Sequence, residues 1–203
     1  MTTIVGLTGG VASGKTNILN FIKKLKIPTH DSDEVVRTLY NNNTKEFIDY
    51  LRLIGLSKAI KNKKINKKRI RKEALNNTRI LKKIERFVHK KVKTSRDKFL
   101  KKNKQNKKKI VVLDIPLLFE NNLQKICDYV FLSYCPIKIR MARALKRKNM
   151  NIKTFNKFVK LQEDDQNKKK KADFIINTSI SKKFTNKQVQ NAIKIIKMKK
   201  EKP

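Results

Sequence analysis

The glycines of this chain are concentrated in one short stretch, because four of the five lie between Gly6 and Gly14. Within it, Gly9, Gly14, Lys15 and Thr16 have the spacing G-x-x-x-x-G-K-[ST] of a phosphate-binding loop. The predicted loop and the residue after it comprise Gly9, Gly10, Val11, Ala12, Ser13, Gly14, Lys15, Thr16 and Asn17.

A loop of this kind has a defined chemistry. Its backbone N–H groups turn inward to cradle the α- and β-phosphates, Lys15 reaches the β- and γ-phosphates, and the Thr16 hydroxyl binds Mg²⁺. A short apolar run leads into the loop and an amphipathic helix leads out of it, as the motif requires. A chance match in a strand–helix turn is the alternative, which the low glycine content disfavours. The sequence therefore predicts binding of a nucleoside triphosphate.

A cluster of acidic residues follows the second predicted strand. Asp31, Asp33 and Glu34 are three of only sixteen acidic residues in the chain. Ligands of parallel α/β sheets bind outside the carboxyl ends of the strands, so we expect these carboxylates to face the terminal phosphate. There Asp33 would accept the proton of an attacking hydroxyl. Such residues also cap helices, and both roles hold together if Asp31 is the cap and Asp33 the base.

Further candidates lie later in the chain. Asp114 ends an apolar strand, where it would either bind Mg²⁺ through water or cap the next turn. Arg140, Arg143 and Arg147 lie on one predicted helix, and Arg143 and Arg147, four residues apart, would share a face directed at phosphate or at solvent. His89 is a lone histidine, which is more typical of a packed or surface residue than of a catalyst. The four lysines at residues 168–171 are expected to be solvated.

Alternating strands and helices surround these candidates. Strands are predicted at residues 3–7, 29–31, 110–114, 129–134 and 174–176, and helical stretches at 15–26, 33–40, 44–102, 137–165 (two helices) and 181–200. A basic loop is expected at residues 101–109. This alternation favours a parallel sheet covered on both faces. We therefore predict the α/β class, with a P-loop NTPase-like, five-stranded parallel sheet and helical insertions after the second and fourth strands.

Composition sets further limits. A chain of 203 residues is long enough for one α/β unit with a substantial core. No apolar run approaches the roughly 18 residues of a membrane span, and a strand rather than a signal peptide begins the chain. Cys127 and Cys135 have neither metal-ligand spacing nor the pattern of a disulfide framework. We expect a cytoplasmic monomer without a membrane partner.

The formal net charge of +37 has two interpretations. One is nucleic-acid binding through phosphate neutralisation. The other is compositional drift, because lysine, asparagine and isoleucine, which have AT-rich codons, are all abundant. The lysines are dispersed along the chain, and no row of aromatic residues offers a stacking platform for single strands. Drift is the favoured interpretation, and we expect only non-specific, salt-sensitive binding to polyanions.

Several motifs together resemble the dephospho-CoA kinase family over nearly the whole chain. The loop is shared with many nucleotide-binding proteins. More specific are Ile-Pro-Thr-His-Asp-Ser-Asp at residues 27–33, Leu-Asp-Ile-Pro-Leu-Leu-Phe-Glu at 113–120 and Ala-Asp-Phe-Ile-Ile-Asn at 172–177. The pattern is completed by Arg37, Val88, His89, Arg143, Arg147, Gln162 and Lys168.

The resemblance implies that the γ-phosphoryl group of ATP, with Mg²⁺, is transferred to the 3′-hydroxyl of dephospho-coenzyme A, the last step of coenzyme A synthesis. It implies one domain over residues 1–203, with a core (1–36, 107–136 and 167–203), a helical CoA-binding insertion (37–106) and a helical lid (137–166). The implied catalytic residues are Asp33, Lys15, Arg143 and Arg147. ATP would bind to the loop and to Asn177, and the substrate would bind to Asp33, Arg37, His89 and Gln162. Mg²⁺ would be held by Thr16 and Asp114.

The chain departs from the family pattern at four places. Asn17 replaces a serine or threonine, Lys90 replaces a proline, Lys148–Asn149 lacks a glycine, and Glu163–Asp164 lacks a proline. None of these changes removes a residue with an assigned chemical role. Two other functions stay open: another small-metabolite or nucleoside monophosphate kinase of the P-loop class, and a basic nucleic-acid-binding P-loop protein, against which the acidic cluster argues.

Overall fold

The computed structural model describes residues 1–148 and 150–201. Asn149, part of one departure from the family pattern, and residues 202–203 lie outside the described residues. The chain divides into two compact units. The first unit is Met1–His30 with Lys102–Pro203, and the second unit is Asp31–Lys101. None of the helices in the described part of the chain is long and apolar enough to span a membrane.

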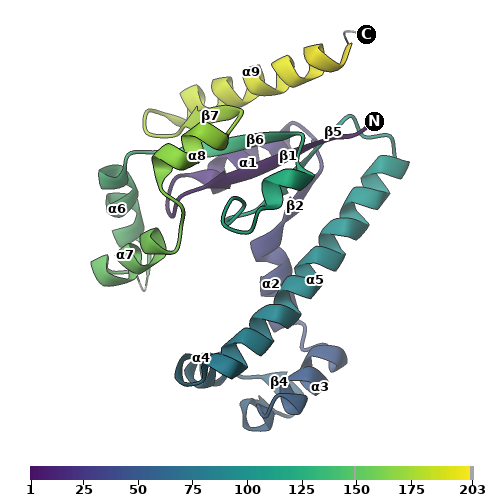
Figure 1. The fold of residues 1–203 in the computed structure, drawn as a ribbon, viewed down its shortest axis with the longest axis vertical. Helices are drawn as coiled ribbons and strands as arrows, with labels where there is room; N and C mark the ends of the chain where they lie inside the picture. The colour runs from purple at the N-terminus through teal and green to yellow at the C-terminus, as the bar shows by residue number, and fades with distance from the viewer. Residues whose placement is uncertain (149, 202–203) are drawn as a thin grey trace. The chain divides into compact units, whose positions relative to one another are not determined.

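A five-stranded sheet is the centre of the first unit (Figure 1). Its strands are β1 (Thr3–Gly9), β2 (Thr29–Asp31), β5 (Ile110–Asp114), β6 (Tyr129–Tyr134) and β7 (Phe174–Asn177), in the spatial order β2-β5-β1-β6-β7. β1 runs parallel to both β5 and β6, and β6 runs parallel to β7. The predicted five strands and their parallel arrangement are confirmed. Because β1 is central, its carboxyl end opens between two neighbouring strands.

Two helices cover one face of this sheet. They are α1 (Lys15–Lys24) and α9 (Lys182–Glu201), which contact each other. Ile18 and Ile22 of α1 and Val189 of α9 are fully buried against Leu7 and Phe131 of the strands. The apolar positions of both helices recur at helical spacing, so each presents one hydrophobic stripe to the sheet. This cluster fixes the start of α1 relative to the end of β1.

The second unit is helical and has its own core. It contains α2 (Ser32–Asn41), α3 (Lys45–Leu53), α4 (Lys67–Asn76) and, up to Lys101, α5 (Thr78–Gln105). The ring of Phe87 stacks on those of Phe47 and Tyr50, with centroids 5.3 and 4.3 Å apart. Burial raises the pKa of the Tyr40 phenol beside this cluster. A separate aromatic core is what a self-contained folding unit requires.

Some element boundaries differ from those predicted. α1 ends at Lys24, because Lys26 adopts a left-handed φ of 57°. The stretch predicted as largely helical also contains a short turn of helix, η1 (Ser57–Ala59), and an antiparallel hairpin of β3 (Ile60–Lys61) and β4 (Lys64–Ile65). The basic loop expected at residues 101–109 is shorter, since α5 continues to Gln105.

Three helices follow the fourth strand of the main sheet. α6 (Ile137–Leu145) and α7 (Ile152–Lys160) are the two predicted helices of the predicted lid, residues 137–166. A third helix, α8 (Asp165–Lys171), leads back and contacts β6. Earlier, a short helical turn, η2 (Leu123–Ile126), connects β5 to β6. Cys135 is buried and Cys127 is partly buried.

Candidate active site

The glycine-rich loop lies between β1 and α1, at the carboxyl end of the central strand. The Ser13 N–H donates to the Gly10 carbonyl at 3.0 Å, which closes a tight turn. Ala12 has a left-handed φ of 58°. α1 begins immediately afterwards at Lys15, so the positive end of its dipole borders the loop. The local geometry is that of an anion-binding turn.

Two glycines of the loop have packing reasons to be glycine. Gly14 has a φ of 92°, and a Cβ there would lie 3.1 Å from the Thr178 side chain. At Gly10 a Cβ would overlap the guanidinium of Arg140, which lies directly on the loop. The motif residues therefore serve both backbone conformation and close approach of other elements.

A hydrogen-bonded network ties the loop to the ends of β6 and β7. The Ser13 hydroxyl donates to the Ser133 hydroxyl at 3.1 Å, and the latter donates to the Ser13 carbonyl at 3.0 Å. The Thr178 hydroxyl also donates to the Ser13 carbonyl. All three residues are buried. These bonds hold the loop rigid before any ligand binds, which lowers the entropic cost of binding.

Lys15 and Asp114 form an ion pair at the centre of the site. Lys15 Nζ lies 2.5 Å from Asp114 Oδ1, and the side chains are only 16% and 6% exposed. The next residue, Thr16, is exposed on the first turn of α1. Carboxylate and hydroxyl oxygens are the donors that Mg²⁺ prefers. The chemistry of Asp114 and Thr16 therefore fits that ion.

The predicted lid packs on the loop through an apolar cluster. Ala12 of the loop, Ala144 of α6 and Phe155 of α7 are buried together, with Val11 and Val159 packed against them. We call this group the lid–loop cluster. It brings the lid helices into direct contact with the backbone that would bind phosphate.

The two predicted lid arginines occupy different places. The Arg143 guanidinium, on α6, donates to the Thr178 carbonyl at 2.7 Å and to its hydroxyl at 3.2 Å. Arg147 is exposed and lies beyond the end of α6, because that helix stops at Leu145. The prediction that both arginines lie on one helix is therefore wrong. Arg143 reaches the loop through Thr178, the same residue that hydrogen-bonds Ser13.

Gln162 and Asn177 make specific contacts within the first unit. The Val11 N–H donates to Gln162 Oε1 at 2.9 Å, so Gln162 touches the loop itself. Asn177 Oδ1 accepts from the Ser179 N–H at 2.8 Å and from the Ser179 hydroxyl at 2.6 Å. Asn177 thereby holds the turn after β7. Their predicted roles as substrate and ATP ligands stay predictions.

Three predicted site residues belong to the second unit. Asp31 Oδ1 accepts from the Glu34 N–H at 3.0 Å, which confirms Asp31 as the N-cap of α2. Asp33 is exposed on the first turn of that helix, and Arg37 forms an ion pair with Glu34. His89 is exposed on α5. This helix continues unbroken past Lys90, the position at which the family pattern has proline.

Sequence reasoning missed a buried ion pair between Glu120 and Lys168. Lys168 Nζ lies 3.1 Å from Glu120 Oε1, and the Lys168 side chain is 1% exposed. The prediction that residues 168–171 form a solvated run is therefore wrong at its first member. The only signal for it was the family pattern, in which both Glu120 and Lys168 appear, because a run of four lysines looks uniformly polar.

A second missed interaction involves Arg140. This residue is 4% exposed, and its Nη2 lies 3.2 Å from Asp165 Oδ2 at the start of α8. The pair joins α6, the first helix of the predicted lid, to the start of α8. In a chain with 53 lysine and arginine residues, nothing in the sequence distinguishes Arg140 from its exposed neighbours.

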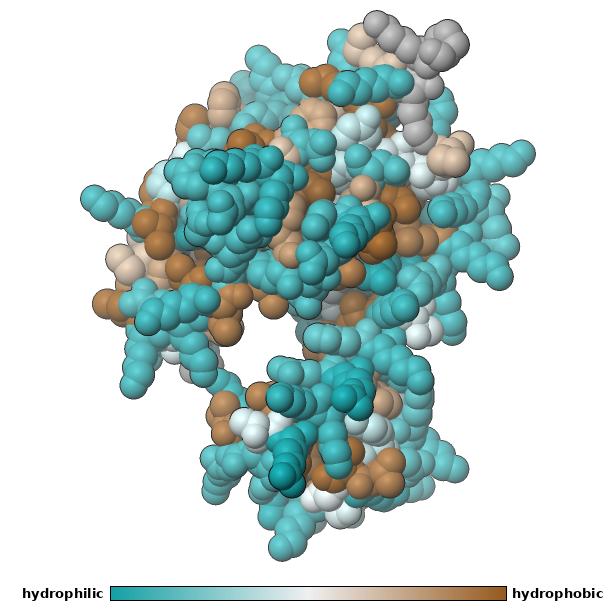
Figure 2. Space-filling model, viewed as in Figure 1, coloured by the Kyte–Doolittle hydropathy of each residue, from teal (hydrophilic) through white to brown (hydrophobic). Residues whose placement is uncertain are grey.

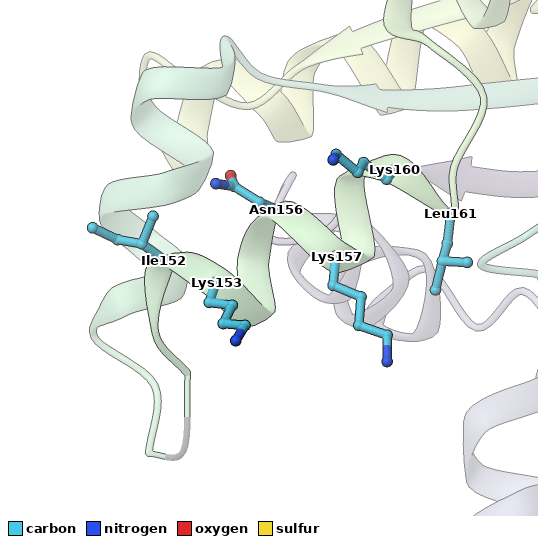
Figure 3. Close-up of a pocket in the computed structure, with 6 residues that line it drawn as sticks. All are labelled: Ile152, Lys153, Asn156, Lys157, Lys160 and Leu161. Carbon is cyan, nitrogen blue, oxygen red and sulfur yellow. The ribbon is translucent and has the colours of Figure 1, made fainter. Parts of the chain in front are cut away.

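An open pocket lies along α7 (Figure 3). It is lined by Ile152, Lys153, Asn156, Lys157, Lys160 and Leu161. Lys153 and Lys157 point to the same side of the helix, whereas Lys160 points elsewhere. Half of the lining residues are lysines, so the pocket adds positive charge to the predicted lid. On the face drawn in Figure 2, hydrophilic residues are likewise spread widely rather than gathered in one patch.

The fold and the loop together define a class of protein. A parallel sheet in this strand order, with a glycine-rich phosphate loop after its central strand and helices that pack on that loop, is the arrangement of a P-loop kinase. Two solved structures share the fold. A protein of Thermus thermophilus superposes with a TM-score of 0.78 at 20% identity, over 96% of this chain and 97% of the other. Dephospho-CoA kinase from Campylobacter jejuni gives 0.72 at 23% identity, over 97% and 98%.

Sequence comparison identifies the family. The family model described as dephospho-CoA kinase matches residues 3–183. A dephospho-CoA kinase of Bartonella quintana is 35% identical over 192 residues, which is 94% of this chain and 96% of the relative. The chain belongs to the dephospho-CoA kinase family. Kinases of this family use ATP as the phosphoryl donor.

Proposed function

We propose that this protein phosphorylates the 3′-hydroxyl of dephospho-coenzyme A with ATP and so forms coenzyme A. The observation that carries the proposal is the intact phosphate loop, whose Lys15 lies against Asp114 in a chain that matches the family over residues 3–183. We further propose that the protein acts as a monomer in the cytoplasm.

The loop would bind the triphosphate of ATP. Its backbone N–H groups and the start of α1 supply fixed positive charge, and Lys15 supplies a mobile one. Thr16 and Asp114 would hold Mg²⁺. When bound, this ion neutralises charge on the β- and γ-phosphates.

Asp33 would act on the acceptor. The residue is exposed, and the N-cap of α2 is Asp31 rather than Asp33. Asp33 would accept the proton of the 3′-hydroxyl as the hydroxyl oxygen attacks the γ-phosphorus, and ADP would leave. Arg37 and His89 would contact the acceptor from the helical insertion, residues 37–106.

The remaining predicted residues would complete the nucleotide site. Arg143 and Arg147 would stabilise the charge on the transferred group, as guanidinium groups do in other phosphoryl transfers. Asn177 and its neighbours would lie near the adenine. Contact of the predicted lid with the loop supports exclusion of water during transfer.

The test is an assay of ADP release with and without dephospho-coenzyme A, with mass spectrometry of the product. We expect ADP release that depends on this acceptor and a product phosphorylated at the 3′ position. Nucleoside monophosphates and small alcohols serve as competing acceptors. Preferential phosphorylation of one of these would replace the proposal by another P-loop kinase activity, and binding of RNA without any acceptor-dependent turnover would favour a nucleic-acid function.

A further inference from the structure

Gln162 presents only one end of its carboxamide to the protein. The Val11 N–H can be satisfied only by an acceptor, so the contact at 2.9 Å fixes Oε1 against the loop. The Nε2 group is then the end left over, and it has no hydrogen-bond partner among the described residues. An amide NH₂ group has two donors and no acceptor. Gln162 therefore places a donor beside a backbone amide of the phosphate loop.

The residue after Gln162 is anchored to the core. The Glu163 N–H donates to Glu120 Oε1 at 2.8 Å, and the same oxygen is 3.1 Å from Lys168 Nζ. Glu120 follows β5 and Lys168 lies on α8, so this pair joins elements from distant parts of the chain. Two residues further on, Asp165 pairs with Arg140. The backbone that carries Gln162 is therefore held from two sides.

The geometry of the Glu120–Lys168 pair is poorly suited to stabilising the fold. Glu120 Oε2 and Lys168 Nζ are both buried without a hydrogen-bond partner among the described residues, although Lys168 Nζ lies 3.1 Å from Glu120 Oε1. A buried pair with unsatisfied atoms is often no more stabilising than apolar residues of similar volume. What Glu120 does supply is an acceptor for the Glu163 amide, next to Gln162.

We propose that Gln162 donates from Nε2 to a phosphate oxygen of the nucleotide bound on the loop, and that Glu120 and Lys168 are its positioning residues. The inference rests on the proposed nucleotide site. A neutral amide that donates to an anionic oxygen forms a charge-assisted bond, which is about twice as strong as one between neutral groups. The contact of Gln162 with the Val11 N–H holds this donor beside the loop.

The first test measures binding of a non-hydrolysable ATP analogue by titration calorimetry. Gln162→Met removes the donor and should weaken binding about 10- to 100-fold, the range for a hydrogen bond to a charged group. Gln162→Glu keeps an acceptor for Val11 but directs a carboxylate oxygen at the phosphate, and should weaken binding at least as much. Gln166→Glu, an exposed position on α8, is the matched control and should bind as the wild type does. Unaltered affinity of Gln162→Glu would overturn the inference.

The second test asks whether Glu120 and Lys168 act through Gln162. The double variant Glu120→Leu with Lys168→Leu removes the acceptor for the Glu163 amide and should reproduce the loss seen in Gln162→Met. Combined with Gln162→Met, it should cause no further loss, since residues that act in one unit are not additive. Glu120→Gln with Lys168→Met keeps the acceptor and should restore binding to within about threefold of the wild type.

The outcomes separate this inference from the proposed function. Additive losses, or failure of the Gln–Met pair to restore binding, would show that Glu120 and Lys168 only support the fold and would overturn their assignment. A wild-type protein that binds the analogue but does not phosphorylate dephospho-coenzyme A would contradict the proposed acceptor, while the binding data would still decide the role of Gln162.

Discussion

Replacing Lys168 by methionine measures how much the stability of the fold depends on this buried charge. The Lys168 side chain is 1% exposed and that of Glu120 is 15% exposed, so the variant leaves a carboxylate in the interior without its counter-charge. Breaking a buried pair in this way costs about 3–5 kcal/mol of unfolding free energy. For a chain of this length, that corresponds to a melting temperature lower by roughly 6–20 °C.

Lys171→Met is the matched control for this measurement. Lys171 lies on the same helix and its Nζ is 2.6 Å from Glu163 Oε1, but its side chain is 49% exposed. A solvent-exposed pair contributes about 0–1 kcal/mol, so this variant should melt within a few degrees of the wild type. Urea and thermal unfolding followed by circular dichroism give both values. If the two variants lose equal stability, the argument from burial is refuted.

The site itself makes four further predictions. Lys15→Ala should weaken ATP binding and reduce turnover together, as calorimetry and the ADP assay would report; undiminished turnover would speak against the loop assignment. Asp33→Asn should lower kcat by about 10²–10⁴, with the Kd for ATP unchanged, because a general base contributes that much; near-normal kcat would exclude Asp33 as the base. Gly10→Ala displaces Arg140 and should cost about 1–3 kcal/mol in urea unfolding, but less in an Arg140→Ala background; equal costs would contradict the close approach. Binding to RNA, measured by fluorescence anisotropy, should fall steeply as salt rises to about 0.2 M; persistent tight binding there would revive the nucleic-acid alternative.

Local patterns predicted the sheet and the phosphate loop well. β5 is a continuous apolar run closed by an acidic residue, Ile110–Asp114, and such a short run is typical of a buried parallel strand. The loop could be predicted because its conformation requires glycines. Gly14 has a left-handed φ, and Gly10 allows the close approach of Arg140. The Asp31 cap was predictable for a similar reason, since its acceptor serves an amide only three residues away.

Features that depend on distant packing could not be predicted from local sequence. Lys168 is one of four consecutive lysines, and only the contact of α8 with the core decides which one turns inward. The β3–β4 hairpin has no glycine at its turn, although Asn62 and Lys63 both adopt a positive φ. Arg147 was placed on α6 because its spacing from Arg143 continues the helical period, but the helix ends two residues before it.

Within the candidate site, too, some residues could be predicted from local sequence and others could not. The residues of the motif, such as Lys15, were identified from spacing alone. The partners of that motif, including Arg140 and Glu120, are polar residues in a very polar chain, and their roles depend on contacts more than 20 residues away in sequence. The proposed catalytic roles of Asp33 and Arg147 rest on the family pattern and on the experiments above.

The lid–loop cluster also has a thermal consequence. Opening of the predicted lid would expose Ala12, Ala144 and Phe155, all of which are at most 7% exposed, to water. Hydration of hydrocarbon raises heat capacity, so the opening step should have a positive heat-capacity change. If opening limits product release, the Arrhenius plot of turnover will therefore be curved rather than straight, even over temperatures at which the protein stays folded.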